Sequence, residues 1–116
     1  MKRLLLVDDD LEISKRMVAL LEDRYEVIPA TTGFEALGEL EHGPFDLVLL
    51  DLRMPGLDGR GFLREMRRRN AHAPVIVLSA DPNVASAARE MGVDDYLQKP
   101  FDVEALEALI ERRVGA

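Results

Sequence analysis

The sequence contains no cysteine and no tryptophan, and aromatic residues make up only 5% of its 116 positions. Without cysteine, the chain can form no disulfide bond, no thiolate zinc site and no cysteine nucleophile. Its two histidines, His42 and His72, lie in different segments and form no helical metal pair. We therefore expect no histidine-based zinc site.

Basic residues are also in deficit: 15 lysines and arginines stand against 22 acidic residues, so the formal net charge is −7. This charge argues against direct binding to nucleic acid, because phosphate backbones are bound by clustered basic side chains. No apolar run approaches the roughly 18 residues of a membrane helix, and the apolar run after Arg3 is too short for a signal peptide. We expect a soluble, cytoplasmic protein that forms one domain over residues 1–116.

Short apolar runs alternate with longer segments of helical periodicity along the chain. We predict five strands, at Leu4–Val7, Val27–Ile28, Leu47–Leu50, Val75–Leu78 and Tyr96–Leu97. We predict five helices, at Leu11–Asp23, Gly33–Glu41, Gly59–Arg69, Asn83–Met91 and Val103–Val114. Asp102 is a suitable N-cap for the last of them. The alternation indicates an α/β fold, a single-domain (βα)5 doubly wound parallel sheet with the flavodoxin-like strand order 2-1-3-4-5.

The apolar residues of three helices define the faces that we expect to be buried. In the first helix they are Leu11, Ile13, Met17, Val18, Leu20 and Leu21, and in the second they are Phe34, Leu37 and Leu40. The third helix turns Phe62, Leu63 and Met66 inward and five arginines outward: Arg60, Arg64, Arg67, Arg68 and Arg69. Such an arginine stripe is most often a solvated face, but on an acidic domain it could meet an acidic partner.

Acidic residues follow two strands that should be neighbours in this strand order. Asp8 and Asp9 follow the first strand, and Asp51 ends the third, so the three carboxylates meet at one edge of the sheet. Such a cluster persists only with a cation or with raised pKa values of the carboxylates, and hard oxygen ligands suit Mg²⁺. Lys99 would add a positive charge and Ser79 a hydroxyl group. The pocket is therefore suited to bind a phosphoryl group, which one of its carboxylates would accept by attacking phosphorus.

Two other functions are compatible with such a fold. A flavodoxin-like cofactor binder would need a Gly, Ser and Thr loop after the first strand, where this chain has Asp8, Asp9 and Asp10. A phosphate-ester hydrolase with an aspartyl nucleophile would need a second acid two residues after that nucleophile, where this chain has Arg53. Asp10, whose side chain should face away from the pocket, is better explained as a cap of the first helix.

Over nearly its whole length the sequence resembles the receiver (CheY-like) domains of two-component response regulators. The resemblance rests on four motifs in order: L-L-V-D-D-D at Leu5–Asp10, D-L-R-M-P-G-L-D-G at Asp51–Gly59, V-L-S-A at Val77–Ala80, and D-D-Y-L-Q-K-P-F at Asp94–Phe101. Each motif stands at a strand end. Within the second motif, Met54-Pro55-Gly56 and Gly59 should shape the loop after the third strand.

The resemblance implies a role for each acidic residue of the pocket. Asp51 would be the phosphoacceptor. Asp9 would ligate Mg²⁺ directly, and Asp8 would act mainly through water. The main-chain carbonyl of Arg53 would complete the protein ligands of the metal.

The resemblance also implies roles for residues of the last two strands. Lys99, held by a cis peptide bond before Pro100, would pair with the phosphoryl oxygens. Ser79 would hydrogen-bond the phosphoryl group and move toward it on activation. Tyr96 would be the rotameric switch residue coupled to that movement.

Two positions suggest a hypothesis about the lifetime of the phosphorylated state. In receivers, the residues two after the phosphoacceptor and two after the hydroxyl position flank the water that hydrolyses the phosphoryl group. Here they are Arg53 and Asp81, which carry opposite charges. We predict that they form an ion pair across the mouth of the pocket and slow hydrolysis.

The resemblance implies a phosphorylation switch that modifies itself, and not an enzyme in the usual sense. A sensor histidine kinase or phosphotransfer protein would supply the phosphoryl group, and the fourth helix, fifth strand and fifth helix would bind an effector protein, an output domain or a second copy of the chain. On that surface we place Arg89, Glu90, Asp95, Gln98, Glu104, Glu107, Glu111 and Arg112.

The alternative is a receiver-like interaction module that works without phosphorylation. A single-domain shuttle, a piece of a larger regulator and a part of a sensor kinase all remain open.

Overall fold

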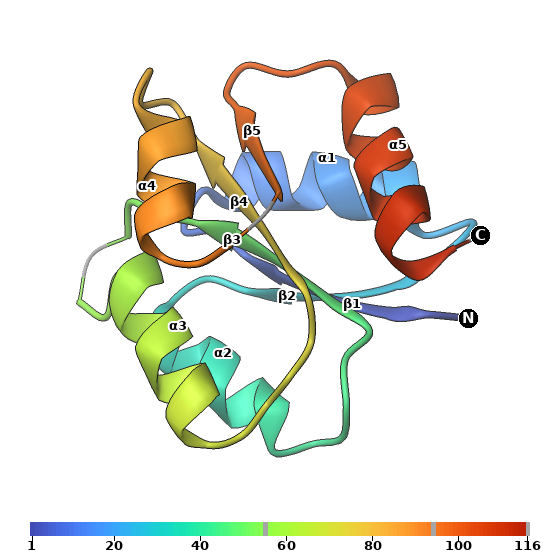
Figure 1. Cartoon of the computed structure of the whole chain (residues 1–116). Coiled ribbons are helices and arrows are strands. Elements are labelled where there is room, and N and C mark those ends of the chain that lie inside the picture. The colour runs from blue at the N-terminus through green and yellow to red at the C-terminus, as the bar shows by residue number, and fades with distance from the viewer. Residues whose placement is uncertain (55, 94, 116) are drawn as a thin grey trace.

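The computed structural model describes residues 1–54, 56–93 and 95–115 (Figure 1). Pro55 and Asp94, which belong to two of the four motifs, lie outside the described residues. The strands are β1 (Arg3–Val7), β2 (Glu26–Ala30), β3 (Leu47–Asp51), β4 (Val75–Ser79) and β5 (Asp95–Gln98). The helices are α1 (Leu11–Leu21), α2 (Gly33–Leu40), α3 (Gly59–Arg68), α4 (Val84–Glu90) and α5 (Val103–Val114).

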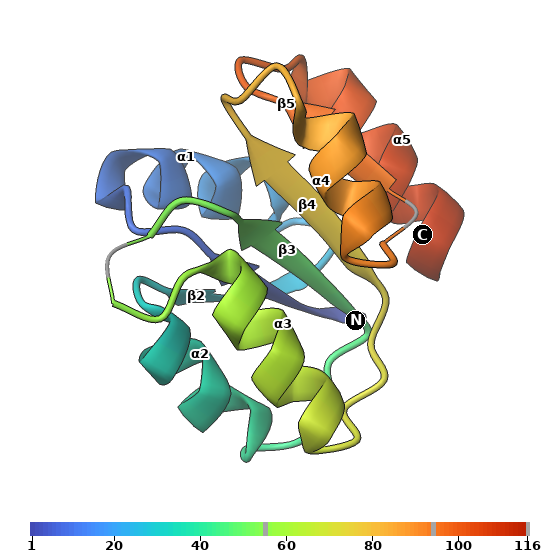
Figure 2. The same ribbon diagram turned by 60° about the vertical axis from the view of Figure 1, so that its left-hand side comes forward.

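The five strands form one parallel sheet in the order β2-β1-β3-β4-β5, which confirms the predicted topology. Figures 1 and 2 show helices on both sides of this sheet. Leu5 and Val7 of β1 pack in a core with residues of α2, α3 and α4, whereas Leu4 and Leu6 pack in a second core with residues of α1 and α5. The central strands are therefore apolar on both faces, as expected for a parallel sheet covered by helices.

Three apolar residues that we expected to be buried are exposed. Leu11 and Leu20 of α1 are 57% and 51% exposed, and Phe34 of α2 is 66% exposed. At 3.6 residues per turn, each lies about a quarter-turn or more from the centre of the buried face of its helix. In α1 that face is formed by Ser14, Met17 and Leu21. The predicted apolar faces were therefore too broad.

The caps of the helices fix where the loops of the carboxyl edge of the sheet end. Asp10 caps α1 and accepts hydrogen bonds from the amides of Glu12 and Ile13, as predicted. Asp58 caps α3 by accepting from the amide of Gly61. Asp102 occupies the N-cap position of α5, but among the described residues its side chain makes no capping hydrogen bond. Across residues 1–54, 56–93 and 95–115, no helix has both the length and the apolar character needed to cross a membrane.

Candidate phosphoacceptor and metal site

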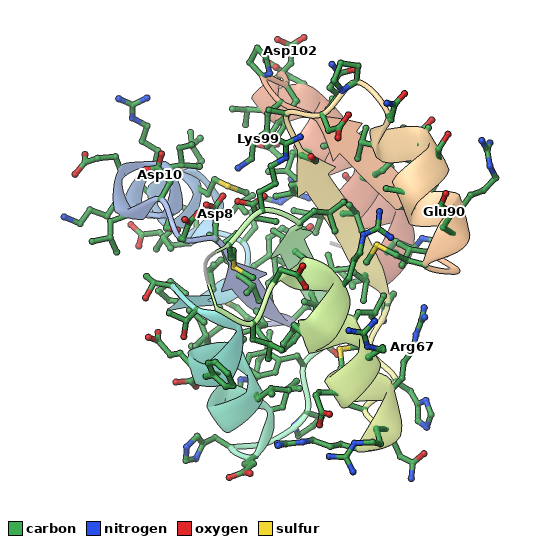
Figure 3. All side chains as sticks on the ribbon, turned by 90° about the vertical axis from the view of Figure 1, so that its left-hand side faces the viewer. Asp8, Asp10, Arg67, Glu90, Lys99 and Asp102 are labelled. Atoms are coloured by element: carbon green, nitrogen blue, oxygen red, sulfur yellow. The ribbon has the colours of Figure 1, made fainter. Side chains whose placement is uncertain are left out.

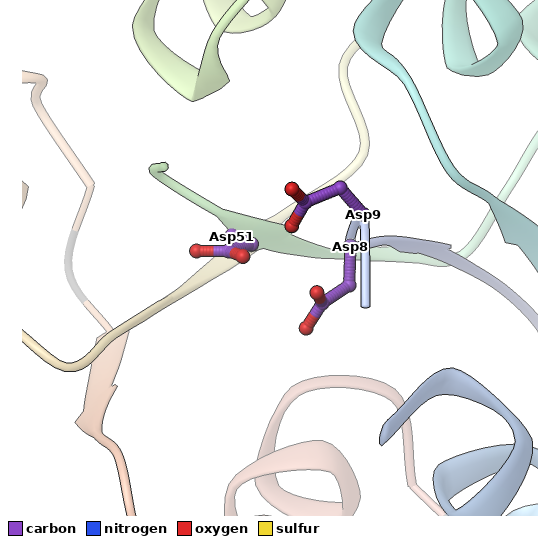
Figure 4. A group of neighbouring side chains, drawn as sticks. All are labelled: Asp8, Asp9 and Asp51. Atoms are coloured by element: carbon purple, nitrogen blue, oxygen red, sulfur yellow. The ribbon is translucent and has the colours of Figure 1, made fainter. Parts of the chain in front are cut away.

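Three carboxylates converge at the carboxyl edge of the sheet, as the strand order predicts. β1 and β3 pair side by side, with Val7 opposite Leu50, so Asp8 and Asp9 follow β1 next to Asp51 at the end of β3. One oxygen from each carboxylate lies within 4.8 Å of the other two (Figure 4). Asp8 and Asp51 are buried and Asp9 is exposed. This donor set has the oxygen chemistry that Mg²⁺ prefers.

Lys99 brings a positive charge into this cluster from the far side of β4. Its Nζ lies 2.9 Å from Oδ2 of Asp8 and 3.5 Å from Oδ2 of Asp51. Burial alone would lower the pKa of Lys99, but the hydrogen bond and charge of Asp8 and the charge of Asp51 outweigh it and raise that pKa. Lys99 is therefore protonated and holds the two buried carboxylates together. The Lys99–Pro100 peptide bond is cis, the geometry that the resemblance implied.

Asp8 and Asp9 differ in how fully protein groups occupy their carboxylate oxygens. In addition to the ion pair of Oδ2 with Lys99, Oδ1 of Asp8 accepts a hydrogen bond of 2.9 Å from the amide of Asp10. Among the described residues, the carboxylate of Asp9 has no hydrogen bond or ion pair from another protein group. Asp9 therefore offers its oxygens to an incoming cation more readily than Asp8 does.

Asp51 lies in an environment that favours its neutral form. Burial raises its pKa, and the charge of Asp8 adds to this rise, while the amide of Arg53 and the charge of Lys99 act in the opposite direction. The amide of Arg53 donates to Oδ1 of Asp51 at 3.1 Å. A cation placed among these carboxylates would favour the ionised form, which is the form that can attack phosphorus.

α3 begins so close to Asp51 that only glycine fits at its first position. A Cβ added to Gly59 would lie 2.6 Å from the carbonyl oxygen of Asp51 and 2.8 Å from Cα of Leu52. Both neighbours are backbone atoms and cannot move aside without displacing β3. Gly59 therefore sets how closely α3 packs beneath the Asp51 carboxylate.

Ser79 and Tyr96 occupy different environments. Ser79 ends β4 beside Asp51, is 1% exposed, and its Oγ accepts a hydrogen bond of 3.1 Å from the amide of Asp81. Tyr96 on β5 is 43% exposed. In this conformation the tyrosine side chain is available at the surface that α4, β5 and α5 share.

Arg53 and Asp81 form the ion pair that the sequence led us to predict. Nη2 of Arg53 donates to Oδ2 of Asp81 at 3.1 Å, and the two residues come from the loops that follow β3 and β4. A hydrogen bond from the amide of Asn83 and a second from Arg53 lower the pKa of Asp81, so it is ionised at neutral pH. Both side chains are partly exposed, so solvent screens the pair.

Asp95 is the charged residue whose environment differs most from the prediction. We placed it on the partner-binding surface, but it is buried at the start of β5 and forms ion pairs with Arg112, at 3.0 Å, and Arg113 of α5. These arginines outweigh its desolvation and lower its pKa. An arginine pair at the end of a helix is usually solvated, so no local pattern in the sequence indicated this contact.

Comparisons with known proteins agree with this fold and site. A family model for the response regulator receiver domain matches residues 4–111. The transcriptional regulatory protein CiaR of Streptococcus pneumoniae is 38% identical over 96% of this chain and 50% of its own length. The structure of Vibrio cholerae chemotaxis protein CheY4 aligns with a TM-score of 0.88 at 30% identity, covering 97% of this chain and 98% of that one. The structure of response regulator TrrA of Thermotoga maritima, solved with Mg²⁺-BeF, aligns with a TM-score of 0.85 at 34% identity. The alignment covers 97% of this chain and 98% of that one.

This chain belongs to the response regulator receiver domain family. It spans about half the length of several curated relatives, including CiaR and the probable transcriptional regulator ycf27 of Cyanophora paradoxa, of which it covers 46%.

Proposed function

We propose that the chain, residues 1–116, is one receiver domain that works as a phosphorylation switch with Asp51 as the phosphoacceptor. The observation that carries this proposal is the position of the Asp51 carboxylate: it lies 3.5 Å from Nζ of Lys99 and within 4.8 Å of carboxylate oxygens of Asp8 and Asp9. The likeness to receiver domains, including one solved with Mg²⁺-BeF, supports the same conclusion.

Mg²⁺ is part of this proposal, because the carboxylate oxygens of the cluster fit its preferences. Asp9 and Asp51 would hold the ion with their side chains and Arg53 with its main-chain carbonyl, while Asp8 would act mainly through water. Bound there, the metal would supply positive charge next to the oxygens of the phosphoryl group. Lys99, whose Nζ lies 3.5 Å from Oδ2 of Asp51, would contribute a second positive charge.

The proposed transfer moves one phosphoryl group and leaves the domain itself modified. An oxygen of Asp51 forms a bond to phosphorus, the bond between phosphorus and the donor nitrogen of a phosphohistidine breaks, and the imidazole keeps that electron pair and takes up a proton. The donor would be a sensor histidine kinase or a phosphotransfer protein. Because the product is the acyl phosphate on Asp51, each event changes the protein and not a released substrate.

The added charge would change the interactions of Ser79 and Lys99. Ser79 would give up its hydrogen bond with the amide of Asp81 and donate to the phosphoryl group. The loop after β4 would move with Ser79, and Tyr96 would then turn from its exposed position. The surface of α4, β5 and α5 would then bind an effector protein, an output domain or a second copy of the chain. A cytoplasmic location remains part of this proposal.

The Arg53–Asp81 pair would tune the lifetime of the phosphorylated state. It bridges the loop that follows Asp51 and the loop that follows Ser79, and the resemblance to receivers implies that these two positions flank the approach of the attacking water. By covering that approach, the pair would slow hydrolysis of the acyl phosphate.

The direct test is the intact mass of the protein after incubation with Mg²⁺ and acetyl phosphate. We expect one phosphoryl group on the parent and none on Asp51→Asn. Asp10→Asn is the matched control: it changes a neighbouring aspartate but retains a good N-cap, so it should be phosphorylated like the parent. The addition of a phosphoryl group to Asp51→Asn would show that a different aspartate is the acceptor. No gain on the parent, even with a sensor kinase as donor, would favour the phosphorylation-independent interaction module.

A further inference from the structure

A groove runs between α3 and α4 toward the amino-terminal edge of the sheet, opposite the acidic site. It consists of two adjoining hollows of about 200 and 230 Å³ that share Leu63 and Arg67. Its charged and titratable lining residues are Arg60, Arg64, Arg67, His72, Glu90, Asp95 and Arg113. We call this feature the α3–α4 groove. Figure 3 shows Arg67 and Glu90 projecting from the two helices on one side of the molecule.

The positive charge of the α3–α4 groove is only partly neutralised. Of its two carboxylates, Asp95 is held by Arg112 and Arg113, and Glu90 lies 3.7 Å from Arg60. Within the described parts of the chain, no carboxylate lies within ion-pairing distance of Arg64 or Arg67. Arg67 donates only a long hydrogen bond of 3.3 Å, to the carbonyl of Gly92. Among the residues that the structure describes, these two arginines therefore face the groove without an ion pair.

The neighbouring arginines on α3 differ in this respect. Arg68 pairs with Glu65 at 2.8 Å, and Arg69 pairs with Glu41 at 3.5 Å and with Glu65 at 4.0 Å. These two residues do not line the groove. The unpaired charge is thus confined to the side of α3 that faces α4.

We propose that the α3–α4 groove binds an acidic segment of a partner protein. Aspartate or glutamate side chains of that segment would enter the two hollows and pair with Arg64 and Arg67. The planar guanidinium group can bind a carboxylate through two parallel hydrogen bonds, which makes arginine a frequent anchor of protein interfaces. The partly exposed apolar residues of the groove, Ala71, Ala73 and Val75, would contact apolar side chains between the acidic ones.

A short acidic peptide fits these observations better than nucleic acid or an anionic membrane does. Only two of the chain's 22 acidic residues line the groove, so the remaining surface would repel an extended polyanion. A short segment is confined to the groove and avoids that repulsion. The groove also lies away from Asp51, so this proposal stands or fails independently of the phosphorylation chemistry.

The test uses the unphosphorylated full chain and a fluorescein-labelled 12-residue peptide that repeats Glu-Leu-Asp-Ser. We expect fluorescence anisotropy to show saturable binding that weakens with added salt. The double variant Arg64→Ala/Arg67→Ala should lower affinity by about fivefold or more, whereas Arg68→Ala/Arg69→Ala should change it by less than about twofold. Both variants remove two positive charges from α3 or its C-cap, but Arg68 and Arg69 lie outside the groove and are held in ion pairs.

Three results would overturn the proposal. The peptide could fail to bind, or the two double variants could lose affinity equally, which would indicate a response to net charge alone. Tighter binding of a labelled 12-nucleotide single-stranded DNA than of the peptide would assign the groove to nucleic acid. Circular dichroism of both variants checks that the fold is retained before affinities are compared.

Discussion

Lys99 lies closer to Asp8 than to the proposed phosphoacceptor. Its Nζ is 2.9 Å from Oδ2 of Asp8 and 3.5 Å from Oδ2 of Asp51, although Lys99 follows β5 and Asp8 follows β1 on the far side of β3 and β4. Asp8 is fully buried, so this contact supplies the positive charge that its carboxylate needs. Without a metal ion, Lys99 therefore acts first as the counter-charge of Asp8.

Lys99→Met should lower the stability of the protein in the absence of Mg²⁺. The change leaves two buried carboxylates next to each other without a cation, and we expect a loss of about 2–4 kcal/mol in the free energy of unfolding. Urea denaturation at pH 7 with a chelator measures it. Lys15→Met, which removes an exposed lysine from α1, is the control and should change stability by less than about 0.5 kcal/mol. Equal stability of the two variants would contradict this role of Lys99.

Asp9→Asn should stabilise the protein without Mg²⁺ and weaken its response to the ion. Removing one carboxylate from a cluster of three relieves repulsion, but it also removes a proposed ligand. For the parent, Mg²⁺ at ten times its Kd should raise the free energy of unfolding by about 1.4 kcal/mol. Thermal unfolding with and without Mg²⁺ tests both effects, and Asp10→Asn should respond to Mg²⁺ like the parent. A full Mg²⁺ response in Asp9→Asn would exclude Asp9 as a ligand.

Arg53→Ala and Asp81→Ala should each shorten the lifetime of the phosphorylated state. Either change removes the ion pair across the mouth of the pocket, and we expect autodephosphorylation to become about two- to fivefold faster, since exposed pairs are weak. The double variant should resemble the single variants, because all three lack the same pair. Decay of the phosphorylated mass after removal of the phosphodonor gives the rate. Changes below about twofold in both single variants would show that the pair is not a barrier to water.

The fold and the acidic cluster could be predicted because each depends on a pattern that is local in the sequence. Continuous apolar runs mark β1, β3 and β4, and the residue after each run necessarily lies at the carboxyl edge of the sheet. This is why the sequence alone predicts that Asp8 and Asp51 lie close together. Short right-handed connections leave few possible strand orders, and 2-1-3-4-5 is the common one for a domain of this size.

The environment of Asp95 could not be predicted in the same way. Its environment depends on the packing of α5, which brings Arg112 and Arg113 to the start of β5. Similarly, helical periodicity shows that Phe34 is apolar and near a buried face, but it does not show how wide that face is. Both errors come from tertiary packing, which the spacing of residues within one element does not record.

The ion pairs of Asp95 should make stability depend on pH in the acidic range. Because Arg113 and Arg112 lower the pKa of Asp95 in the folded state, their stabilisation is complete above the unfolded-state pKa of about 3.9 and is lost as pH falls through the lower folded-state value. Asp95→Asn should therefore be less stable than the parent by about 1–2 kcal/mol at pH 7, and the difference should shrink below about pH 4.

Urea denaturation of both proteins from pH 2.5 to pH 7 measures this difference. Asp102→Asn is the control, because Asp102 is exposed and, among the described residues, its side chain makes no capping bond. Its stability should follow that of the parent across the range. A difference between Asp95→Asn and the parent that does not vary with pH would show that the ion pairs contribute no net stabilisation.

Two glycine-to-alanine changes should have opposite effects, and together they test how tightly α3 packs beneath Asp51. In Gly59→Ala the new Cβ would meet backbone atoms of Asp51 and Leu52 at 2.6 and 2.8 Å, so we expect a loss of about 1–3 kcal/mol. In Gly38→Ala nothing lies within 4 Å of the new Cβ, and replacing a glycine inside α2 should stabilise by about 0.5–1 kcal/mol. Urea denaturation measures both changes.

The same pair of variants should differ in the rate of phosphorylation. Because the new Cβ at position 59 would displace the end of β3, Gly59→Ala should also slow phosphorylation by acetyl phosphate, whereas Gly38→Ala should leave that rate unchanged. A Gly59→Ala protein as stable and as readily phosphorylated as the parent would mean that β3 and α3 can separate without moving the Asp51 carboxylate.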